Sequence, residues 1–273
     1  MADPTIEDAE AVLEEAVQAY REVLGKRLIA AYALGSLAHG GFSPLVSDVD
    51  IGLIVADPVG PSDGATIHSI AEALKAGGSE LHARLSVFWG TPLTLAGRRP
   101  GGRFPPLDRL DLLQDGRLLA GEDARAGLPQ PSRVDLLVAG AEFALGSLAG
   151  DAMVEQVRRP DLLLGGGIRH VTKLVLFPVR FLYTAETGLV GTNHAAAAHY
   201  AAASDDRPSA GLVAAALAWR SIPPDDAEAA ALLGREIGPL YCHYLDDHVA
   251  RLSAVPRLDL SDGFAAWRLR ITR

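Results

Sequence analysis

Apolar side chains in the first 25 residues recur at steps of three and four. That period places them on one face of a helix. Thr5 is a suitable N-cap, because its hydroxyl can accept a hydrogen bond from the first turn, and Gly25 is a suitable end. The apolar face consists of Val12, Leu13, Ala16, Val17, Tyr20, Val23 and Leu24.

Residues 28–121 alternate between strand-like and helix-like segments. Short apolar runs bounded by glycine, serine or aspartate predict strands, and apolar positions with helical spacing predict the helices between them. Residues 37–47 and 91–106 are rich in turn-forming residues and are predicted to be loops. The expected strands cover 28–34, 48–56, 84–89 and 116–119, and the expected helices cover 65–76 and 107–113.

The second half of the chain carries helical patterns only. Residues 121–132 contain two prolines and little periodicity, which indicates a domain boundary. Beyond it, helices are expected at 133–149, 168–187, 192–203, 209–219 and 225–252. The predicted fold class is therefore α+β, with a small α/β domain over residues 1–125 and an all-helical C-terminal bundle over residues 126–273.

The composition is that of an acidic globular chain. A net charge of −9 repels phosphate backbones, so a nucleic acid polymer is not expected as a partner. The single cysteine, Cys242, excludes an intramolecular disulfide and suits a reducing cytoplasm. No signal peptide is recognised, and the most apolar stretch is interrupted by Pro178 and Arg180. We therefore expect a cytoplasmic protein without membrane contacts.

Residues 35–50 carry the pattern that indicates chemistry. Gly35-Ser36 follows the first expected strand, and Asp48-Val49-Asp50 opens the second after eleven intervening residues. A strand directs alternate side chains to opposite faces, so Asp48 and Asp50 project together. Two carboxylates on one face repel each other, and Mg²⁺, which binds a few carboxylates together with phosphate oxygens and water, relieves that repulsion. The pair therefore predicts a metal site for phosphoryl-type transfer.

The turn at Gly35-Ser36 is predicted to bind phosphate. Gly35 has no side chain, so a phosphate can approach the backbone closely. The amides of the turn and the Ser36 hydroxyl can donate hydrogen bonds to it, and Ser47 can supply a second hydroxyl. The alternative is an aspartate-rich strand start after a structural Gly-Ser turn. Order, spacing and flanking strands together favour the functional interpretation.

The stretch AYALGSLAHGGFSPLVSDVDIGLIV resembles the signature of the DNA polymerase β-like nucleotidyltransferase superfamily. The two-domain layout looks most like that of the aminoglycoside adenylyltransferases. In the helical half, the run from Arg180 through Tyr183 and Thr187 to Gly188 is similar to their Arg-x-x-Tyr-[Ser/Thr]-x-x-Thr-Gly run. The resemblance implies a mixed sheet with helices on one side, joined to a helical domain that closes over the nucleotide.

The same resemblance implies roles for individual residues. Gly35 and Ser36 would hold the triphosphate, and Ser47 occupies a matching hydroxyl position. Asp48 and Asp50 would bind magnesium and so take part in catalysis.

The chain departs from the family pattern at the third carboxylate. Active members usually carry this acid on a later strand, but the corresponding strand here, residues 83–89, contains no acid. The expected position holds Arg84, Leu85 or Ser86, and Glu80 precedes the strand. A site with one metal ion is therefore expected.

A second departure concerns the base and the nucleotide contacts. The family's glutamate base, near the start of the helix that ends in Thr-Gly, is replaced by an apolar residue. His170 is the candidate base because imidazole titrates near neutrality, and Lys173 is the candidate phosphate contact. Both residues also suit an ordinary helix surface. A nucleotide-binding lysine of the family aligns with Asn193, and Arg103 and Arg109 are candidates to compensate.

Two functions follow from the sequence. The first is an enzyme that moves a nucleoside monophosphate, with AMP as the expected group, from a magnesium nucleoside triphosphate to a hydroxyl of a small molecule. By analogy the acceptor is aminoglycoside-like, and a protein hydroxyl is a second option. The alternative is a non-catalytic nucleotide-binding or regulatory protein of the same fold. The missing acid, the displaced base and the lost lysine motivate this alternative.

Overall fold

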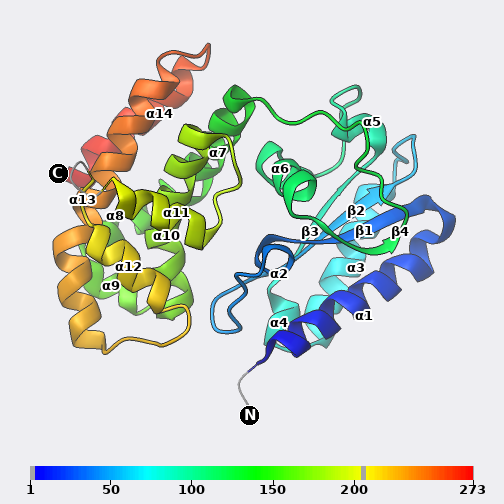
Figure 1. The fold of residues 1–273 in the computed structure, drawn as a ribbon, viewed down its shortest axis with the longest axis horizontal. Coiled ribbons are helices and arrows are strands. Elements are labelled where there is room, and N and C mark those ends of the chain that lie inside the picture. The colour runs from blue at the N-terminus through cyan, green and yellow to red at the C-terminus, as the bar shows by residue number, and fades with distance from the viewer. Residues whose placement is uncertain (1–3, 204–206, 273) are drawn as a thin grey trace. The chain divides into compact units, whose positions relative to one another are not determined.

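The computed structural model describes residues 4–203 and 207–272, and the chain divides into two compact units, Met1–Pro131 and Ser132–Arg273. The first unit contains a mixed sheet with helices, and the described residues of the second form helices alone. The predicted α+β fold class is therefore confirmed (Figure 1). The sequence placed the division after residue 125, within the segment that connects β4 (Arg117–Gly121) to α7 (Arg133–Leu148).

The sheet has the strand order β3-β2-β1-β4 and includes β1 (Leu28–Leu34), β2 (Val49–Val55) and β3 (Leu85–Gly90). β1 pairs antiparallel with β2 and with β4, whereas β2 and β3 are parallel. The register places Asp50 opposite Leu34 on one side and opposite Ser86 on the other. The acidic start of β2 therefore lies where β1 ends and β3 begins.

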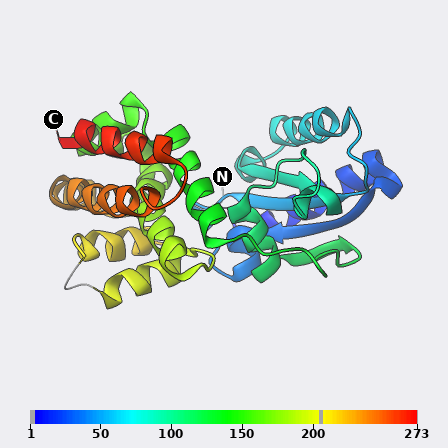
Figure 2. The same ribbon diagram turned by 90° about the horizontal axis from the view of Figure 1, so that it is seen from above.

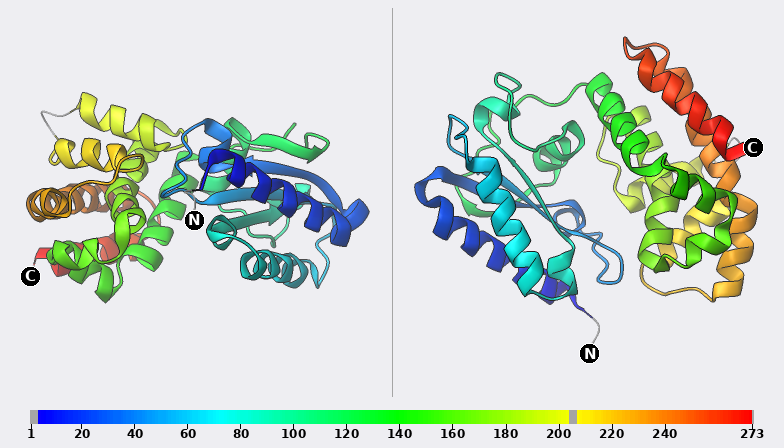
Figure 3. Two further views of the ribbon diagram at one scale, coloured as in Figure 1. Left: turned by 90° about the horizontal axis from the view of Figure 1, so that it is seen from below. Right: turned by 180° about the vertical axis from the view of Figure 1, so that it is seen from behind.

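Helices α1 (Ile6–Leu24) and α3 (Asp63–Gly77) lie along one face of this sheet, as Figure 3 shows from behind. Thr5 caps α1 in a reciprocal pair of hydrogen bonds with Asp8, and Gly25 ends the helix, so both sequence predictions are confirmed. The main core of the first unit lies between these helices and the sheet. Its buried members on β2 are Val49, Ile51, Leu53 and Val55.

The opposite face of the sheet carries a smaller layer. Here α5 (Pro92–Leu95) and α6 (Pro106–Gln114) bury Leu95 and Leu112 against Tyr32 and Ile54. The resemblance implied helices on one side only, so this layer is a difference from the expectation. It brings α6 to the face on which the even-numbered residues of β2 project.

Short helices interrupt segments that the sequence predicted as loops. α2 (Gly35–His39) begins directly after β1, and α5 lies inside the predicted loop 91–106. Thr91 caps α5, whose first residue is Pro92, a combination that favours a helix start. Helices of four or five residues offer no repeated period, so the hydrophobic pattern could not reveal them. The remaining short elements are η1 (Gly25–Arg27) and α4 (Glu80–Ala83).

The second unit packs around a core of aromatic side chains. Tyr241, Tyr244, Phe264 and Trp267 are buried, and the Tyr241 hydroxyl donates a hydrogen bond of 2.9 Å to the Leu174 carbonyl. Figure 2 shows the helices of this unit stacked side by side. They are α7, α8 (Asp151–Arg158), α9 (Pro160–Leu164), α10 (Gly167–Thr187), α11 (Asn193–Ala202), α12 (Ala210–Ala218), α13 (Asp226–Leu252) and α14 (Leu258–Thr272).

The sequence analysis missed three of these helices. α8 and α9 are short and meet at Arg159-Pro160, where proline interrupts the pattern. α14 is different, because Leu260, Phe264 and Trp267 follow helical spacing and all three are buried. The signal for α14 was therefore present in the sequence.

None of the described helices is by itself both long enough and apolar enough to cross a membrane. α7 and α8 pass that test only when taken together, and the chain bends by 82° between them.

Candidate functional site

The two aspartates stand at the start of β2. Asp50 is the second residue of the strand, Asp48 directly precedes its first residue, and both side chains are half-buried. Their neighbours Val49 and Ile51 are buried in the core under α1 and α3. Because side chains alternate along a strand, Asp50 projects from the other face. Asp48 stands just outside the strand, so the common face of the two acids stays a prediction.

Gly35 fits closely against one of these acids. Its φ is +59°, in the left-handed region, and a Cβ atom at this position would overlap the carboxylate oxygen Oδ2 of Asp50. Only glycine therefore allows both this backbone turn and the position of the carboxylate. The contact joins the two halves of the sequence motif, the Gly-Ser turn and the acidic strand start.

Asp111 is a residue of the site that the sequence analysis missed. It lies on α6 with 8% of its surface exposed, and its Oδ2 accepts a hydrogen bond of 2.6 Å from the Gly35 amide. The amide that was predicted to bind phosphate is thus hydrogen-bonded to a carboxylate of the chain. No local pattern marks Asp111, because its partner lies 76 positions away in the sequence.

The two serines are placed differently from each other. Ser36 lies in α2, is half-buried, and accepts a hydrogen bond of 3.0 Å from the Gly41 amide through its carbonyl. Ser47 is buried, and its hydroxyl oxygen accepts a hydrogen bond of 2.9 Å from the Ser43 amide. The Ser47 hydroxyl therefore helps to close the loop before Asp48, and a phosphate contact for either serine stays a prediction.

The third strand carries no acid beside the aspartates. Ser86 pairs with Asp50, Leu85 is buried, and Arg84 precedes the strand. The exposed carboxylate of Glu80 forms an ion pair with Arg84 rather than extending toward β2. Within residues 4–203 and 207–272, no group of three histidine, cysteine, aspartate or glutamate side chains is placed to hold a metal ion.

The proposed base lies near the start of α10. The ring nitrogen Nε2 of His170 is 2.8 Å from the side-chain oxygen of Gln156 on α8. Burial, reinforced by the charge of Arg169, lowers the pKa of His170 below its usual value, so its neutral form predominates at pH 7. Lys173 is half-buried one turn further along the same face. The catalytic role of His170 and the phosphate contact of Lys173 stay predictions.

The run Arg180–Gly188 forms the end of α10. The guanidinium of Arg180 donates to the Gly191 carbonyl, and the Thr187 hydroxyl donates to the Tyr183 carbonyl at 2.7 Å. Gly188 has a φ of +75° and caps the helix, as glycine commonly does at this position. In this chain the residues of the run therefore help to end α10.

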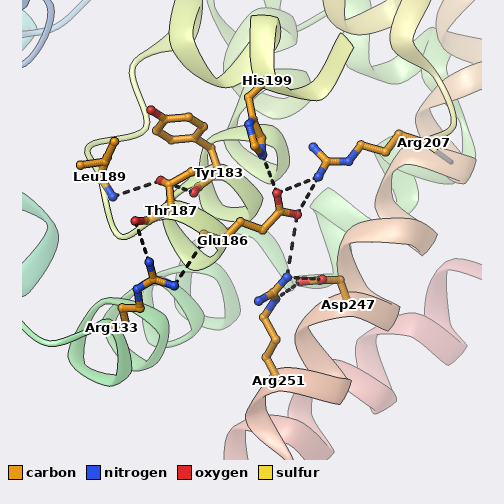
Figure 4. Close-up of polar contacts among 9 residues, drawn as sticks. All are labelled: Arg133, Tyr183, Glu186, Thr187, Leu189, His199, Arg207, Asp247 and Arg251. Atoms are coloured by element: carbon orange, nitrogen blue, oxygen red, sulfur yellow. Dashed lines mark hydrogen bonds and ion pairs between the residues drawn. The ribbon is translucent and has the colours of Figure 1, made fainter. Parts of the chain in front are cut away.

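A charged cluster surrounds Glu186 near this helix end (Figure 4). Its carboxylate lies 2.6 Å from His199 Nε2 and 2.7 Å from an Arg207 nitrogen. Although burial alone would raise the pKa of Glu186, hydrogen bonds from His199 and Arg207 hold it below the usual value. Glu186 is thus held as a carboxylate by side chains of the second unit.

Asp247, on α13, belongs to the edge of the same cluster. Burial would raise the pKa of Asp247, but its contacts with His248 and Arg251 lower it to about 2. Four residues before Asp247 on α13, the ring of His243 packs edge-on against Tyr200, with the ring centres 6.0 Å apart. These side chains stabilise the packing of the helices.

The arginines proposed to compensate for the missing lysine are bound to carbonyl groups of the first unit. Arg103 donates to the Val87 carbonyl at 2.5 Å, and its guanidinium lies 5.2 Å from the Phe88 ring centre. Arg109 donates to the Leu95 carbonyl at 2.9 Å. Both residues therefore have structural tasks.

Comparison with known proteins gives one informative result. No family model matches the chain, and no curated protein matches it. Among solved structures, spectinomycin adenyltransferase AAD(9) from Enterococcus faecialis, solved with ATP and spectinomycin, is similar with a TM-score of 0.55 and 15% identity. The match covers 85% of this chain and 98% of that one. The chain therefore shares the fold of this two-domain adenyltransferase structure, as the resemblance found in its sequence implied.

Proposed function

We propose that this chain is a nucleotidyltransferase that moves a nucleoside monophosphate, with AMP as the expected group, to a hydroxyl of a small molecule. The observation that carries the proposal is the contact between Gly35 and Asp50 in a chain of this fold. That contact brings the glycine-serine turn and the acidic strand start together. The similar solved protein was crystallised with ATP, which supports a nucleoside triphosphate as the donor.

The two aspartates fit a magnesium ion. Asp50 lies on β2, Asp48 directly precedes the strand, and both side chains are half-buried. Mg²⁺ is commonly held by one or two carboxylates, with substrate phosphates and waters completing its ligands. A site with two acids is thus sufficient when the triphosphate is present. When bound, the ion would neutralise charge on the phosphates.

The transfer balances in a single displacement. The acceptor hydroxyl oxygen forms a bond to the α-phosphorus, the bond from that phosphorus to the bridging oxygen breaks, and pyrophosphate leaves. The proton of the hydroxyl passes to a base, for which we propose His170. Its lowered pKa leaves the imidazole neutral near pH 7, and Nδ1 is available if Nε2 donates to Gln156.

An aminoglycoside-like acceptor is proposed because the similar solved protein was crystallised with spectinomycin. Fold alone does not fix a substrate, so an acceptor panel is needed. The second candidate function is non-catalytic nucleotide binding. It is favoured by the absence of an acid on β3, where Ser86 stands beside Asp50.

The test is incubation of the full chain with magnesium, labelled ATP, GTP, CTP or UTP, and a panel of hydroxyl-bearing acceptors, with release of pyrophosphate measured. The double variant Asp48→Asn, Asp50→Asn is the control. Acceptor-dependent release that the double variant lacks supports the enzyme. Tight, magnesium-dependent nucleotide binding without release under any condition supports the non-catalytic function. Binding that is equally strong without magnesium contradicts the role of the aspartates.

A further inference from the structure

Arg84 is one of the three residues that the sequence offered for the position of the family's third acid, and its side chain has defined partners. It lies between α4 and β3 with 10% of its side chain exposed. The guanidinium donates to the Pro44 carbonyl at 2.6 Å and reaches the Ser47 carbonyl at 3.5 Å. Its other terminal nitrogen forms the ion pair with Glu80. The largely buried guanidinium therefore ties the loop before β2 to the segment between α4 and β3.

The partners of Arg84 lie on both sides of Asp48. Ser47, whose carbonyl the side chain reaches, directly precedes the aspartate. Val49 directly follows it, and the Val49 amide donates to the Arg84 carbonyl at 3.2 Å. One residue therefore holds the backbone before and after the metal-binding carboxylate.

We propose that Arg84 is a positioning residue that fixes Asp48 for metal binding. The inference rests on the proposed function, in which Asp48 is a magnesium ligand. Mg²⁺ demands nearly ideal octahedral geometry, so a site with only two protein carboxylates depends strongly on how they are held. Groups that orient metal ligands commonly contribute about 10–100-fold to metal affinity.

The charge of Arg84 makes the proposal testable. An effect of its charge and an effect of its position would change metal affinity in opposite directions when Arg84 is replaced. If the guanidinium acted only as a positive charge near the site, its removal would tighten the binding of a cation. If it holds Asp48 in place, its removal weakens the binding. Glu80 balances the charge locally, which favours the positional effect.

Arg27 offers a matched control. It donates to the Ala56 and Pro58 carbonyls at 3.1 Å each and forms an ion pair of 2.6 Å with Asp63. Arg27 thus holds the segment after β2 much as Arg84 holds the segment before it, but at the end away from Asp48. Arg27→Met should lower thermal stability and leave metal affinity unchanged.

The experiment measures Mn²⁺ binding to the full chain by water-proton relaxation, with and without a non-hydrolysable ATP analogue. Asp48→Asn defines the signal that does not depend on the site. Arg84→Met is expected to weaken the Asp48-dependent binding by about 10–100-fold. Arg84→Lys keeps the charge and one carbonyl contact, so it should restore part of the affinity. Thermal unfolding of each variant separates folding from binding.

The outcomes are distinct. If wild type shows no Asp48-dependent Mn²⁺ binding, the proposed metal role fails and the role of Arg84 fails with it. If wild type binds and Arg84→Met binds equally or more tightly, only the Arg84 inference is overturned. Equal weakening in Arg84→Met and Arg27→Met also overturns it, since the effect would then be general stability. If Arg84→Met does not fold, the Mn²⁺ affinity of Arg84→Lys is the test. An affinity of Arg84→Lys equal to that of wild type would then overturn the proposal.

Discussion

The hydrogen bond between Asp111 and the Gly35 amide should make a measurable contribution to the local stability of the Gly35 turn. Asp111→Ala removes the acceptor and leaves a backbone donor in a partly buried turn. With 8% of Asp111 exposed, solvent replaces the lost partner poorly. Hydrogen bonds to charged groups contribute about 1.5–3 kcal/mol, which corresponds to about a 10–150-fold change in the opening equilibrium of the Gly35 turn.

Asp111→Asn distinguishes the hydrogen bond from the charge. The asparagine oxygen can still accept a hydrogen bond from the Gly35 amide. Asp111→Asn should therefore lower the local stability of the Gly35 turn by about 1 kcal/mol or less. We therefore expect Asp111→Ala to be clearly less stable at this turn than Asp111→Asn.

The assay is hydrogen–deuterium exchange of the Gly35 amide in the full chain, read by NMR under native conditions. Global unfolding is unsuitable, because the chain has two units that need not unfold together. Asp115→Asn, at the end of the same helix, changes the net charge equally and serves as the control. Wild-type exchange at Gly35 in Asp111→Ala would refute the reasoning.

Three further predictions concern single positions. Gly35→Ala should cost about 1–2 kcal/mol for the left-handed backbone and displace the Asp50 carboxylate, so calorimetry should show loss of magnesium-dependent nucleotide binding; unchanged affinity would argue against the contact. His170→Ala should lower turnover by about 10²–10⁴-fold at nearly constant nucleotide affinity, as measured by steady-state kinetics. Lys173→Ala should weaken nucleotide binding, as measured by calorimetry. If neither variant changes turnover or binding, α10 is not part of the site. Asp247, with its pKa lowered to about 2 from 3.8, should stabilise the second unit above about pH 4 and lose that contribution as the pH falls toward 2. In acid unfolding followed by circular dichroism, wild type should therefore be more stable than Asp247→Asn only above this range.

Local patterns in the sequence identified the elements that local interactions determine. β1 was predicted with its observed bounds, because a continuous apolar run ends at Gly35. The cap of α1 at Thr5 follows equally from short-range geometry.

Contacts between distant positions could not be predicted in this way. Asp111 meets Gly35 across 76 positions, and Arg84 meets Pro44 across 40. Neither pair leaves a periodic trace, and a buried acid looks like any other acid until its partner is known. The burial of Ser47 likewise depends on how its loop folds back onto Ser43.

The way α10 ends has a consequence for how related proteins are recognised. The hydrogen bonds of Arg180 and Thr187 and the turn at Gly188 serve helix termination. A search pattern centred on this run would select chains that end a helix in this way, whatever their activity. A pattern that combines Gly35 with Asp48 and Asp50 would instead select chains in which a carboxylate can lie directly against the turn, as Asp50 does here.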